Sequence, residues 1–280
     1  MSAATEPRTL APPERRIAEV KRVERIGAYD LIVARDPIGP ADPRPGQFYM
    51  LAAGERWGGG GGERPYLPRA FSFARVEALP GGQGADLSFL LEDVGPGTRR
   101  LGELAAGDAL ALLGPLGVGF TRPVDGRRPL LVAGGIGVAP ILCWDDELRA
   151  DGVEAPVLLG FRSAGHAEAA ALFAGAPGVS TDDGSAGRHA LVTEPLRSEL
   201  ERDPQVVVYA CGPEGMLVAV KFLCEELGVP VQLAVEAGMA CGYGACFGCV
   251  VPTVDGYERV CVEGPVFDGR RLLAPEAPAA

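Results

Sequence analysis

The sequence predicts an α/β plus β protein. An N-terminal antiparallel β-barrel is followed by an α/β domain with a doubly wound parallel sheet and by a small C-terminal segment. Short apolar runs separated by glycine and proline fill the first part, strand-like and helix-like stretches alternate in the second, and four of seven cysteines gather near the end. The predicted divisions are a disordered tail (1–15), the barrel (16–122), the α/β domain (123–232) and the cysteine-rich segment (233–280).

Composition limits the possible functions. The 280 residues suit two compact domains with a small appendage, and a 47% hydrophobic content is enough for more than one core. A net charge of −11 argues against nucleic acid or an anionic membrane as the main partner. The chain has neither an apolar run of about 18 residues nor a signal-peptide core at its polar start. We therefore expect a cytoplasmic protein that neither spans a membrane nor binds nucleic acid.

Six short apolar runs make up the predicted barrel. They are Ile17–Val23, Tyr29–Val33, Phe48–Ala52, Phe71–Val76, Leu87–Leu91 and Ala109–Leu113. Their spacing and the glycines and prolines between them are typical of a small antiparallel barrel. Five consecutive glycines, Gly58 to Gly62, interrupt the series, and we interpret this stretch as a flexible loop.

Strands and helices alternate after Pro123. The apolar strand runs are Leu130–Ala133, Val157–Phe161 and Val206–Ala210. One helix-like stretch follows the first run and extends to Leu148, and another begins at Pro213 and ends before Gly228. This alternation predicts a parallel sheet with helices on both faces.

The last four cysteines predict a metal site. Cys241, Cys246 and Cys249 follow a C-x4-C-x2-C spacing, and Cys261 completes the set. This spacing matches a plant-type [2Fe–2S] cluster, in which four thiolates bind two irons. Glycines between the cysteines permit tight turns and let backbone N–H groups point at the sulfurs. These glycines are Gly242, Gly244 and Gly248.

Two alternatives remain for these cysteines. A structural zinc ion also binds thiolates, although zinc sites usually combine two close cysteine pairs and only one such pair is present here. Disulfides are the other alternative, and the reducing compartment expected for this chain argues against them.

A motif at the expected start of a barrel strand indicates a flavin. Arg69-Ala70-Phe71-Ser72 resembles the R-x-[FY]-S signature of the ferredoxin-reductase superfamily. The resemblance implies that Arg69 pairs with the pyrophosphate of FAD and that Phe71 and Ser72 lie along its isoalloxazine, with Ser72 near N5. A guanidinium suits a diphosphate because it donates two parallel charge-assisted hydrogen bonds. Taken alone, the motif also fits a plain strand with a surface arginine.

A second motif, G-P-G-T at 95–98, follows at the expected distance. In the same superfamily a Gly-Thr pair at a helix start offers N–H groups and a hydroxyl to the pyrophosphate, a role that falls here to Gly97 and Thr98. A glycine–proline turn capped by threonine is the alternative. The resemblance also aligns three residues with a strand whose backbone contacts the adenosine half of FAD. These residues are Leu90, Leu91 and Glu92.

Two further motifs indicate a nicotinamide dinucleotide. G-G-I-G-V-A-P at 134–140 follows a strand and opens a helix, the context that a phosphate-binding turn needs. C-G-P-E-G-M at 211–216 resembles the superfamily's C-G-P-x-x-M, whose cysteine lies near the nicotinamide. A small buried residue at a strand end is the alternative for this cysteine. The residues expected to bind NAD are Gly134, Gly135, Gly137, Cys211, Gly212 and Pro213.

The order of these sites resembles the electron-transfer subunit of a two-subunit dihydroorotate dehydrogenase. The resemblance covers about residues 16–273 and is most specific at M-A-C-G (239–242), A-C-F-G-C (245–249) and G-P-V-F (264–267). It implies bound FAD, a [2Fe–2S] cluster and NAD as an exchangeable acceptor. It also implies a catalytic partner subunit with FMN, two copies of each subunit, and a role in pyrimidine biosynthesis. Electrons would pass from dihydroorotate through FMN, cluster and FAD to NAD⁺, and this chain alone would not act on dihydroorotate.

Three features depart from the family pattern. Ala70 replaces a common proline, the glycine-rich stretch before Arg69 is long, and Arg188-His189-Ala190 is atypical after the turn at 181–185. Related subunits of a sulfide dehydrogenase, a hydrogenase or an NADH-dependent ferredoxin:NADP⁺ oxidoreductase share the domain order. A non-catalytic scaffold with structural zinc is the alternative of another class.

Overall fold

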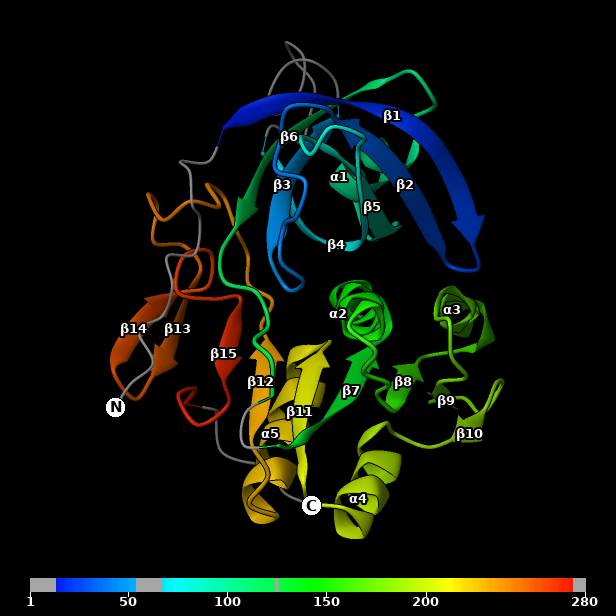
Figure 1. Ribbon diagram of the computed structural model, residues 1–280, viewed down its shortest axis with the longest axis vertical. Coiled ribbons are helices and arrows are strands. Elements are labelled where there is room, and N and C mark those ends of the chain that lie inside the picture. Colours follow the sequence, from blue (N-terminus) through cyan, green and yellow to red (C-terminus); the bar gives the residue numbers. More distant parts are fainter. Residues whose placement is uncertain (1–13, 54–66, 124–125, 274–280) are drawn as a thin grey trace.

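The computed structural model describes residues 14–53, 67–123 and 126–273. It confirms the predicted fold class: a closed antiparallel barrel stands over a mostly parallel sheet, and the C-terminal segment lies beside both (Figure 1). The predicted tail lies almost wholly outside the described residues, and the five-glycine stretch lies outside them entirely. In the part of the chain that is described, no helix is long and apolar enough to cross a membrane.

Six strands close the barrel, and each contains one of the predicted apolar runs. They are β1 (Arg15–Ile26), β2 (Tyr29–Asp36), β3 (Phe48–Ala53), β4 (Arg69–Ala78), β5 (Ala85–Glu92) and β6 (Ala109–Leu116). Their order around the barrel is β1-β2-β5-β4-β3-β6, with every pair antiparallel. In the first half of β1, residues 15–20, exposed and buried residues alternate, because successive side chains of a strand point to opposite faces. A short helix, α1 (Pro96–Gly102), connects β5 to β6.

A buried ion pair joins three barrel strands. Arg16 of β1 donates from Nε to Asp36 Oδ2 at the end of β2, at 2.9 Å, and from Nη2 to the Gly114 carbonyl of β6, at 2.6 Å. The two charged side chains are 6% and 2% exposed. A charge this deeply buried is tolerated only with a partner and further hydrogen bonds, and this arrangement supplies both.

A seven-stranded sheet forms the second layer. Its strands are β7 (Arg128–Gly134), β8 (Val157–Phe161), β9 (Gly178–Thr181), β10 (Arg188–His189), β11 (Val206–Cys211), β12 (Val231–Ala234) and β15 (Val266–Asp268). The order is β10-β9-β8-β7-β11-β12-β15, and only β15 is antiparallel to its neighbour. From β7, the chain adds β8, β9 and β10 on one side of the sheet. It then crosses to the other side of β7, where it adds β11 and β12. The carboxyl ends of β7 and β11 therefore form a switch point, where open α/β sheets bind their ligands.

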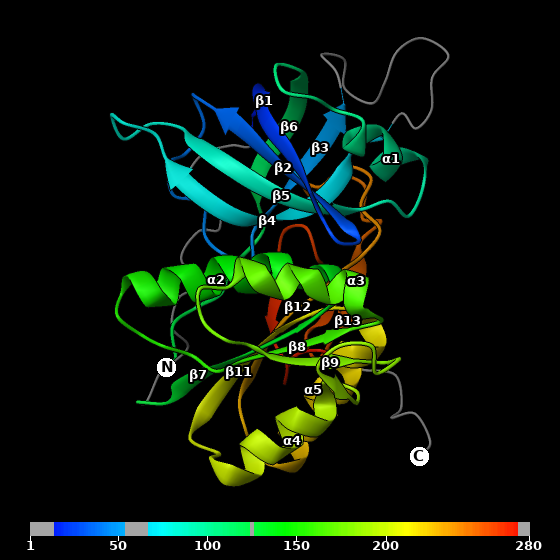
Figure 2. The same cartoon turned by 90° about the vertical axis from the view of Figure 1, so that its right-hand side faces the viewer.

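Helices cover both faces of this sheet (Figure 2). On one face, α2 (Val138–Ala150) and α3 (Ala164–Ala167) lie between the sheet and the barrel. On the other face lie α4 (Thr193–Arg202) and α5 (Glu214–Glu226). Because α2 contacts both β4 and the sheet, its Trp144 belongs to one apolar core that also contains Tyr29 of the barrel and Tyr209 of the sheet. Barrel and sheet are thus packed together through α2.

The C-terminal segment contains more regular structure than its sequence predicts. After the cysteine loop, β13 (Val250–Thr253) and β14 (Gly256–Arg259) form a hairpin, and β15 then joins the edge of the large sheet beside β12. Strands of three or four residues are too short to give a periodic signal. The cysteine loop is consequently anchored at both ends by strands.

We expect the buried ion pair to be required for barrel stability. Asp36→Ala leaves the Arg16 charge buried without its carboxylate and should lower the free energy of unfolding by about 3–5 kcal/mol. Replacing both partners, Arg16→Met with Asp36→Leu, should cost less, because no charge is then left without a partner. Chemical denaturation of the two variants measures the difference. A double variant less stable than Asp36→Ala would contradict this account.

Candidate functional site

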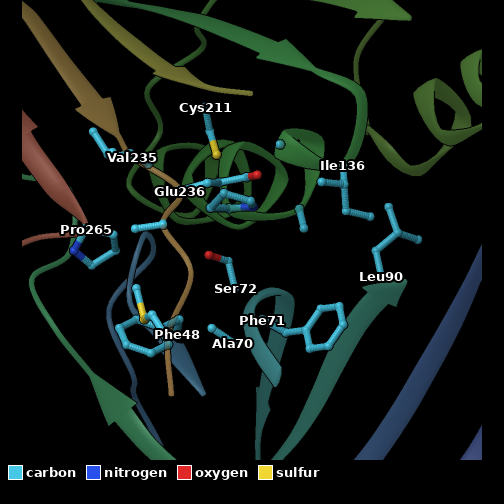
Figure 3. Close-up of a pocket in the computed structure, with 16 residues that line it drawn as sticks. Phe48, Ala70, Phe71, Ser72, Leu90, Ile136, Cys211, Val235, Glu236 and Pro265 are labelled. Atoms are coloured by element: carbon cyan, nitrogen blue, oxygen red, sulfur yellow. The ribbon is translucent and has the colours of Figure 1, made fainter. Parts of the chain in front are cut away.

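A cavity lies where the barrel, the parallel sheet and the C-terminal segment meet (Figure 3). We call it the central cavity. Its wall is mostly apolar and includes predicted flavin and nicotinamide residues from distant parts of the chain. Those residues are Ala70, Phe71, Ser72 and Leu90 from the barrel and Gly137 and Cys211 from the sheet domain.

Three polar side chains face the central cavity: Ser72 on β4, Cys211 at the end of β11, and Glu236 after β12 (Figure 3). Burial raises the pKa of the Cys211 thiol, and the Glu236 carboxylate adds to the effect, so the thiol is protonated at neutral pH. Glu236 remains exposed to solvent, and the partial desolvation beside the cavity raises the pKa of its carboxyl. These groups can orient a ligand and hold a proton beside it. Sequence reasoning missed Glu236, because it lies outside every motif.

The two predicted halves of the pyrophosphate site lie side by side. Arg69 begins β4, and its guanidinium lies so close to Gly97 that a Cβ there would stand 2.6 Å from Nε. A side chain at position 97 would displace the guanidinium from this place. The Thr98 hydroxyl accepts two N–H groups of its own turn, at 3.0 and 3.1 Å, and so fixes the turn beside the guanidinium. Together they form a place where a diphosphate can bind.

The end of β5 presents three predicted residues in different directions. Leu90 lines the central cavity, whereas Leu91 packs into the barrel core, as the alternation of a strand requires. Leu91 can therefore contact a cofactor only through its backbone, which is the contact that the family resemblance implies. Glu92 lines a second cavity.

This second cavity, the nucleotide groove, adjoins the central one. The predicted NAD residues Gly134, Gly135 and Pro213 line it, and Ile136 lines both cavities. The groove lies at the carboxyl ends of β7 and β8, beside the N-terminal end of α5, and so at the switch point of the sheet.

Close backbone approach explains the glycines at the switch point. A Cβ on Gly137 would stand 2.3 Å from the carbonyl oxygen of Cys211, and one on Gly212 would stand 3.0 Å from the nitrogen of Gly134. The turn after β7 thus touches the turn after β11. This approach is the reason why both predicted NAD motifs carry glycine.

Two groove residues escaped sequence reasoning because no motif surrounds them. Arg162 and His166 both contact the Glu92 carboxylate, Arg162 through a direct ion pair and His166 with Nε2 at 3.3 Å. The His166 ring also packs edge-on against Tyr29 at 5.7 Å. These contacts join barrel to sheet domain across the groove. Asp182, in the turn at 181–185, adds a carboxylate at the end of β9.

The four clustered cysteines lie as two pairs. The side chains of Cys241 and Cys246 interact with each other, as do those of Cys249 and Cys261. Cys241 and Cys261 also interact across the two pairs. A [2Fe–2S] cluster is bound by four thiolates, two for each iron. Zinc instead needs its ligands around one point. Within the described ranges, no group of three or more histidine, cysteine or acidic side chains is arranged to hold a metal ion.

We call Cys241 and Cys246 the outer pair and Cys249 and Cys261 the inner pair. Backbone N–H groups point at the sulfurs of the outer pair. Partial burial works to raise the pKa of Cys241, but N–H donors led by that of Cys246 outweigh it and lower the pKa to about 7. The Gly248 N–H donates to Cys246 Sγ at 3.4 Å. In the inner pair, burial and the adjacent Cys249 raise the pKa of Cys261 to about 12. Donors aimed at sulfur stabilise thiolates, and the outer half of the loop is therefore suited to ligation.

The cysteine loop packs directly on the barrel. Gly242 has a φ of 80° and lies against Met50 of β3, where a Cβ would stand 2.5 Å from Met50 Cγ. Cys261 shares a small apolar core with Phe48 and Met239, and both of those residues also line the central cavity. The cysteine loop and the central cavity therefore share a wall.

Two cysteines outside the cysteine loop and the central cavity have packing roles. Cys143 in α2 and Cys224 in α5 are buried in apolar cores, as expected for structural residues. Burial raises the pKa of both thiols, that of Cys224 to about 12. All seven cysteines are free thiols.

Known proteins with similar sequences identify the family. Residues 236–273 match the model of the iron–sulfur cluster binding domain of dihydroorotate dehydrogenase B. The dihydroorotate dehydrogenase B (NAD(+)) electron transfer subunit of Clostridium acetobutylicum is 35% identical over 254 residues, which are 90% of this chain and 96% of that one. The subunit of Listeria monocytogenes is 40% identical over 248 residues, 85% and 90% of the two chains. The chain belongs to this family.

Solved structures agree on the fold. An NADH-dependent reduced ferredoxin-NADP oxidoreductase superposes with a TM-score of 0.75 at 24% identity, covering 92% of this chain and 90% of the other. Phthalate dioxygenase reductase gives a TM-score of 0.58 at 16% identity, covering 89% and 94%. The family to which the chain belongs, with its iron–sulfur domain model, supports the predicted [2Fe–2S] cluster, FAD and NAD, and neither the zinc scaffold nor the related redox subunits are favoured. The roles of individual residues remain predictions.

We expect the paired cysteines to bind two irons and two acid-labile sulfides per chain after anaerobic purification. Cys246→Ala should abolish the cluster, whereas Cys224→Ala, which removes a buried packing thiol, should retain it. Metal analysis, labile-sulfide assay and the visible spectrum measure this. Stoichiometric zinc without labile sulfide would overturn the assignment.

We expect Arg69→Ala to weaken FAD binding by removing a charge-assisted contact of about 1.5–3 kcal/mol. This corresponds to a roughly 10- to 150-fold loss of affinity. Arg69→Lys should restore only part of the loss, because an ammonium lacks the planar fork. Flavin retention and titration of the apoprotein with FAD test both variants. An alanine variant with unchanged affinity would remove Arg69 from the site.

Proposed function

We propose that this chain is the electron-transfer subunit of an NAD-linked dihydroorotate dehydrogenase of pyrimidine biosynthesis, acting in the cytoplasm. The proposal rests on the order in space of three sites: the cysteine loop, the central cavity and the nucleotide groove. The cysteine loop shares Phe48 and Met239 with the central cavity, and the cavity joins the nucleotide groove at Ile136. When bound, the [2Fe–2S] cluster supplies one-electron transfer and FAD supplies the exchange between single electrons and hydride.

The chain's own residues bind and orient these groups. Arg69 and the turn at Gly97 would hold the FAD pyrophosphate beside the central cavity. Ser72, Cys211 and Glu236 line the cavity where the two rings would meet. Burial raises the pKa of the Cys211 thiol, which therefore stays protonated beside the place of the flavin, and desolvation also raises the pKa of the Glu236 carboxyl.

The nucleotide groove supports NAD as the acceptor. Asp182 places a carboxylate at the end of β9, among the residues that line the groove. In dinucleotide-binding sheets a carboxylate accepts hydrogen bonds from a free ribose 2′-hydroxyl, whereas it would repel the 2′-phosphate of NADP.

The partner would dock on the face that carries the cysteine loop. Tyr243 and Phe247 in the loop are 54% and 62% exposed, and Tyr257 at the hairpin is 79% exposed. A group of exposed aromatic side chains is typical of a protein interface. Met239, which the sequence also places near this face, instead lines the central cavity. We propose a catalytic subunit with FMN as the partner, in a complex of two copies of each.

We expect the isolated chain to oxidise NADH with artificial acceptors and to show no activity on dihydroorotate. Adding the FMN subunit should confer dihydroorotate:NAD⁺ activity. Phe247→Asp should weaken this coupling and spare NADH oxidation, because it places a charge on the proposed interface. The left-handed φ of Phe247, 55°, is one that aspartate tolerates, so the loop should keep its shape.

Ile38→Asp provides the matched control. Ile38 is also 62% exposed but lies between β2 and β3 of the barrel, outside the cysteine loop. The control should leave both activities unchanged. Dihydroorotate oxidation by this chain alone would refute the subunit assignment. Equal dihydroorotate:NAD⁺ activity of Phe247→Asp and Ile38→Asp with the FMN subunit would refute the docking face.

A further inference from the structure

Arg259, at the end of β14, contacts the cysteine loop at two points. Its Nη1 donates to the Gly244 carbonyl at 3.2 Å, inside the loop between the first two cysteines. Its guanidinium also lies over the Phe247 ring, 5.0 Å from the centroid. Among the described residues, Phe247 is the one non-glycine with a left-handed φ, so an unusual backbone conformation lies under this contact.

Glu263 fixes the guanidinium in this position. Arg259 Nε and Nη2 donate to the two carboxylate oxygens of Glu263 at 3.1 and 2.8 Å, a forked pair that restricts the orientation of both side chains. The Arg259 backbone N–H donates to the same carboxylate at 2.7 Å. The pair is about one quarter exposed, at 29% and 19%, so water screens it only in part.

The same charge lies near the inner cysteine pair. Arg259 interacts electrostatically with the thiols of both Cys249 and Cys261. The next residue, Val260, donates its N–H to the Cys249 carbonyl at 2.9 Å, which ties the two chain segments together. The Arg259 guanidinium therefore contacts the cysteine loop at Gly244 and also lies within electrostatic range of the inner pair, Cys249 and Cys261.

We propose that Arg259 is a positioning residue that raises the reduction potential of the [2Fe–2S] cluster, and that Glu263 moderates this effect. The inference depends on the cluster of the proposed function. Reduction adds one electron, supplied by the reduced partner flavin, to a site that already carries four thiolates. A fixed cation nearby stabilises the reduced form more than the oxidised form, and a fixed anion does the opposite.

Opposite substitutions separate this electrostatic role from a structural one. Arg259→Gln should lower the potential, by roughly tenfold in the equilibrium constant for one-electron reduction, which is about 59 mV. Glu263→Gln should raise it. Arg259→Lys keeps the charge and should stay nearer to the wild type. A purely structural role would instead damage the cluster in both arginine variants, since lysine lacks the planar fork.

Arg271→Gln is the matched control. Arg271 lies beside the same hairpin and pairs with Glu258 and Asp255, at 2.5 and 3.3 Å, so its loss removes an equal charge. The reduction potential of the cluster in Arg271→Gln should lie closer to the wild-type value than the potential in Arg259→Gln does. The full-length variants are purified anaerobically, and redox titration followed by electron paramagnetic resonance of the reduced cluster gives each potential. Iron and labile-sulfide contents show whether the cluster is complete.

The outcomes are distinct. Opposite shifts in Arg259→Gln and Glu263→Gln support the proposal. If Arg259→Gln retains the cluster at an unchanged potential, the proposal is overturned. If that variant loses its cluster, Glu263→Gln decides, and an unchanged or lowered potential there overturns the proposal. A wild-type chain without labile sulfide overturns the proposed function itself, which these measurements distinguish from a failure of Arg259 alone.

Discussion

The apolar packing of the C-terminal segment against β3 and β6 is the contact on which the arrangement of sites depends. Phe48, Met50 and Leu116 of the barrel share a core with Cys249 and Cys261. If this core were absent, the cysteine loop would be attached only through its flanking strands. Because the loop is packed there, Cys249 and Cys261 share a core with the strand whose Phe48 lines the central cavity. Electron transfer requires such short separations, and a hydrophobic contact provides this one.

The central cavity differs from the cysteine loop in its electrostatics. In the cavity, desolvation is the largest cause of the pKa shifts, and it raises the pKa values of both Cys211 and Glu236. In the outer half of the loop, backbone N–H groups offset desolvation, and the pKa of Cys241 falls. Burial thus raises the pKa of a thiol in the cavity, whereas N–H donors lower the pKa of a thiol in the loop. The same element, sulfur, has two roles because its surroundings differ.

Domain packing determines access to the nucleotide. The groove lies at the switch point of the parallel sheet, but its outer wall includes Glu92 from the barrel, which contacts Arg162 and His166 of the sheet domain. The helix α2 is packed between the two domains, so their relative position is fixed by a shared core. The groove and the central cavity therefore keep a fixed relative position, and Ile136 lines both.

The sequence by itself determined the strands of the barrel, the main βα units and the motifs of all three sites, because these features depend on local periodicity, glycine conformations and cysteine spacing. Only the tertiary structure decided what lies outside such patterns. Glu236 enters the central cavity because β12 ends there, and His166 reaches Glu92 because α3 packs beside the barrel. Arg259 lies beside the cysteine loop because a short hairpin turns it back. Each of these contacts joins residues far apart in the chain, and no local pattern records such a contact.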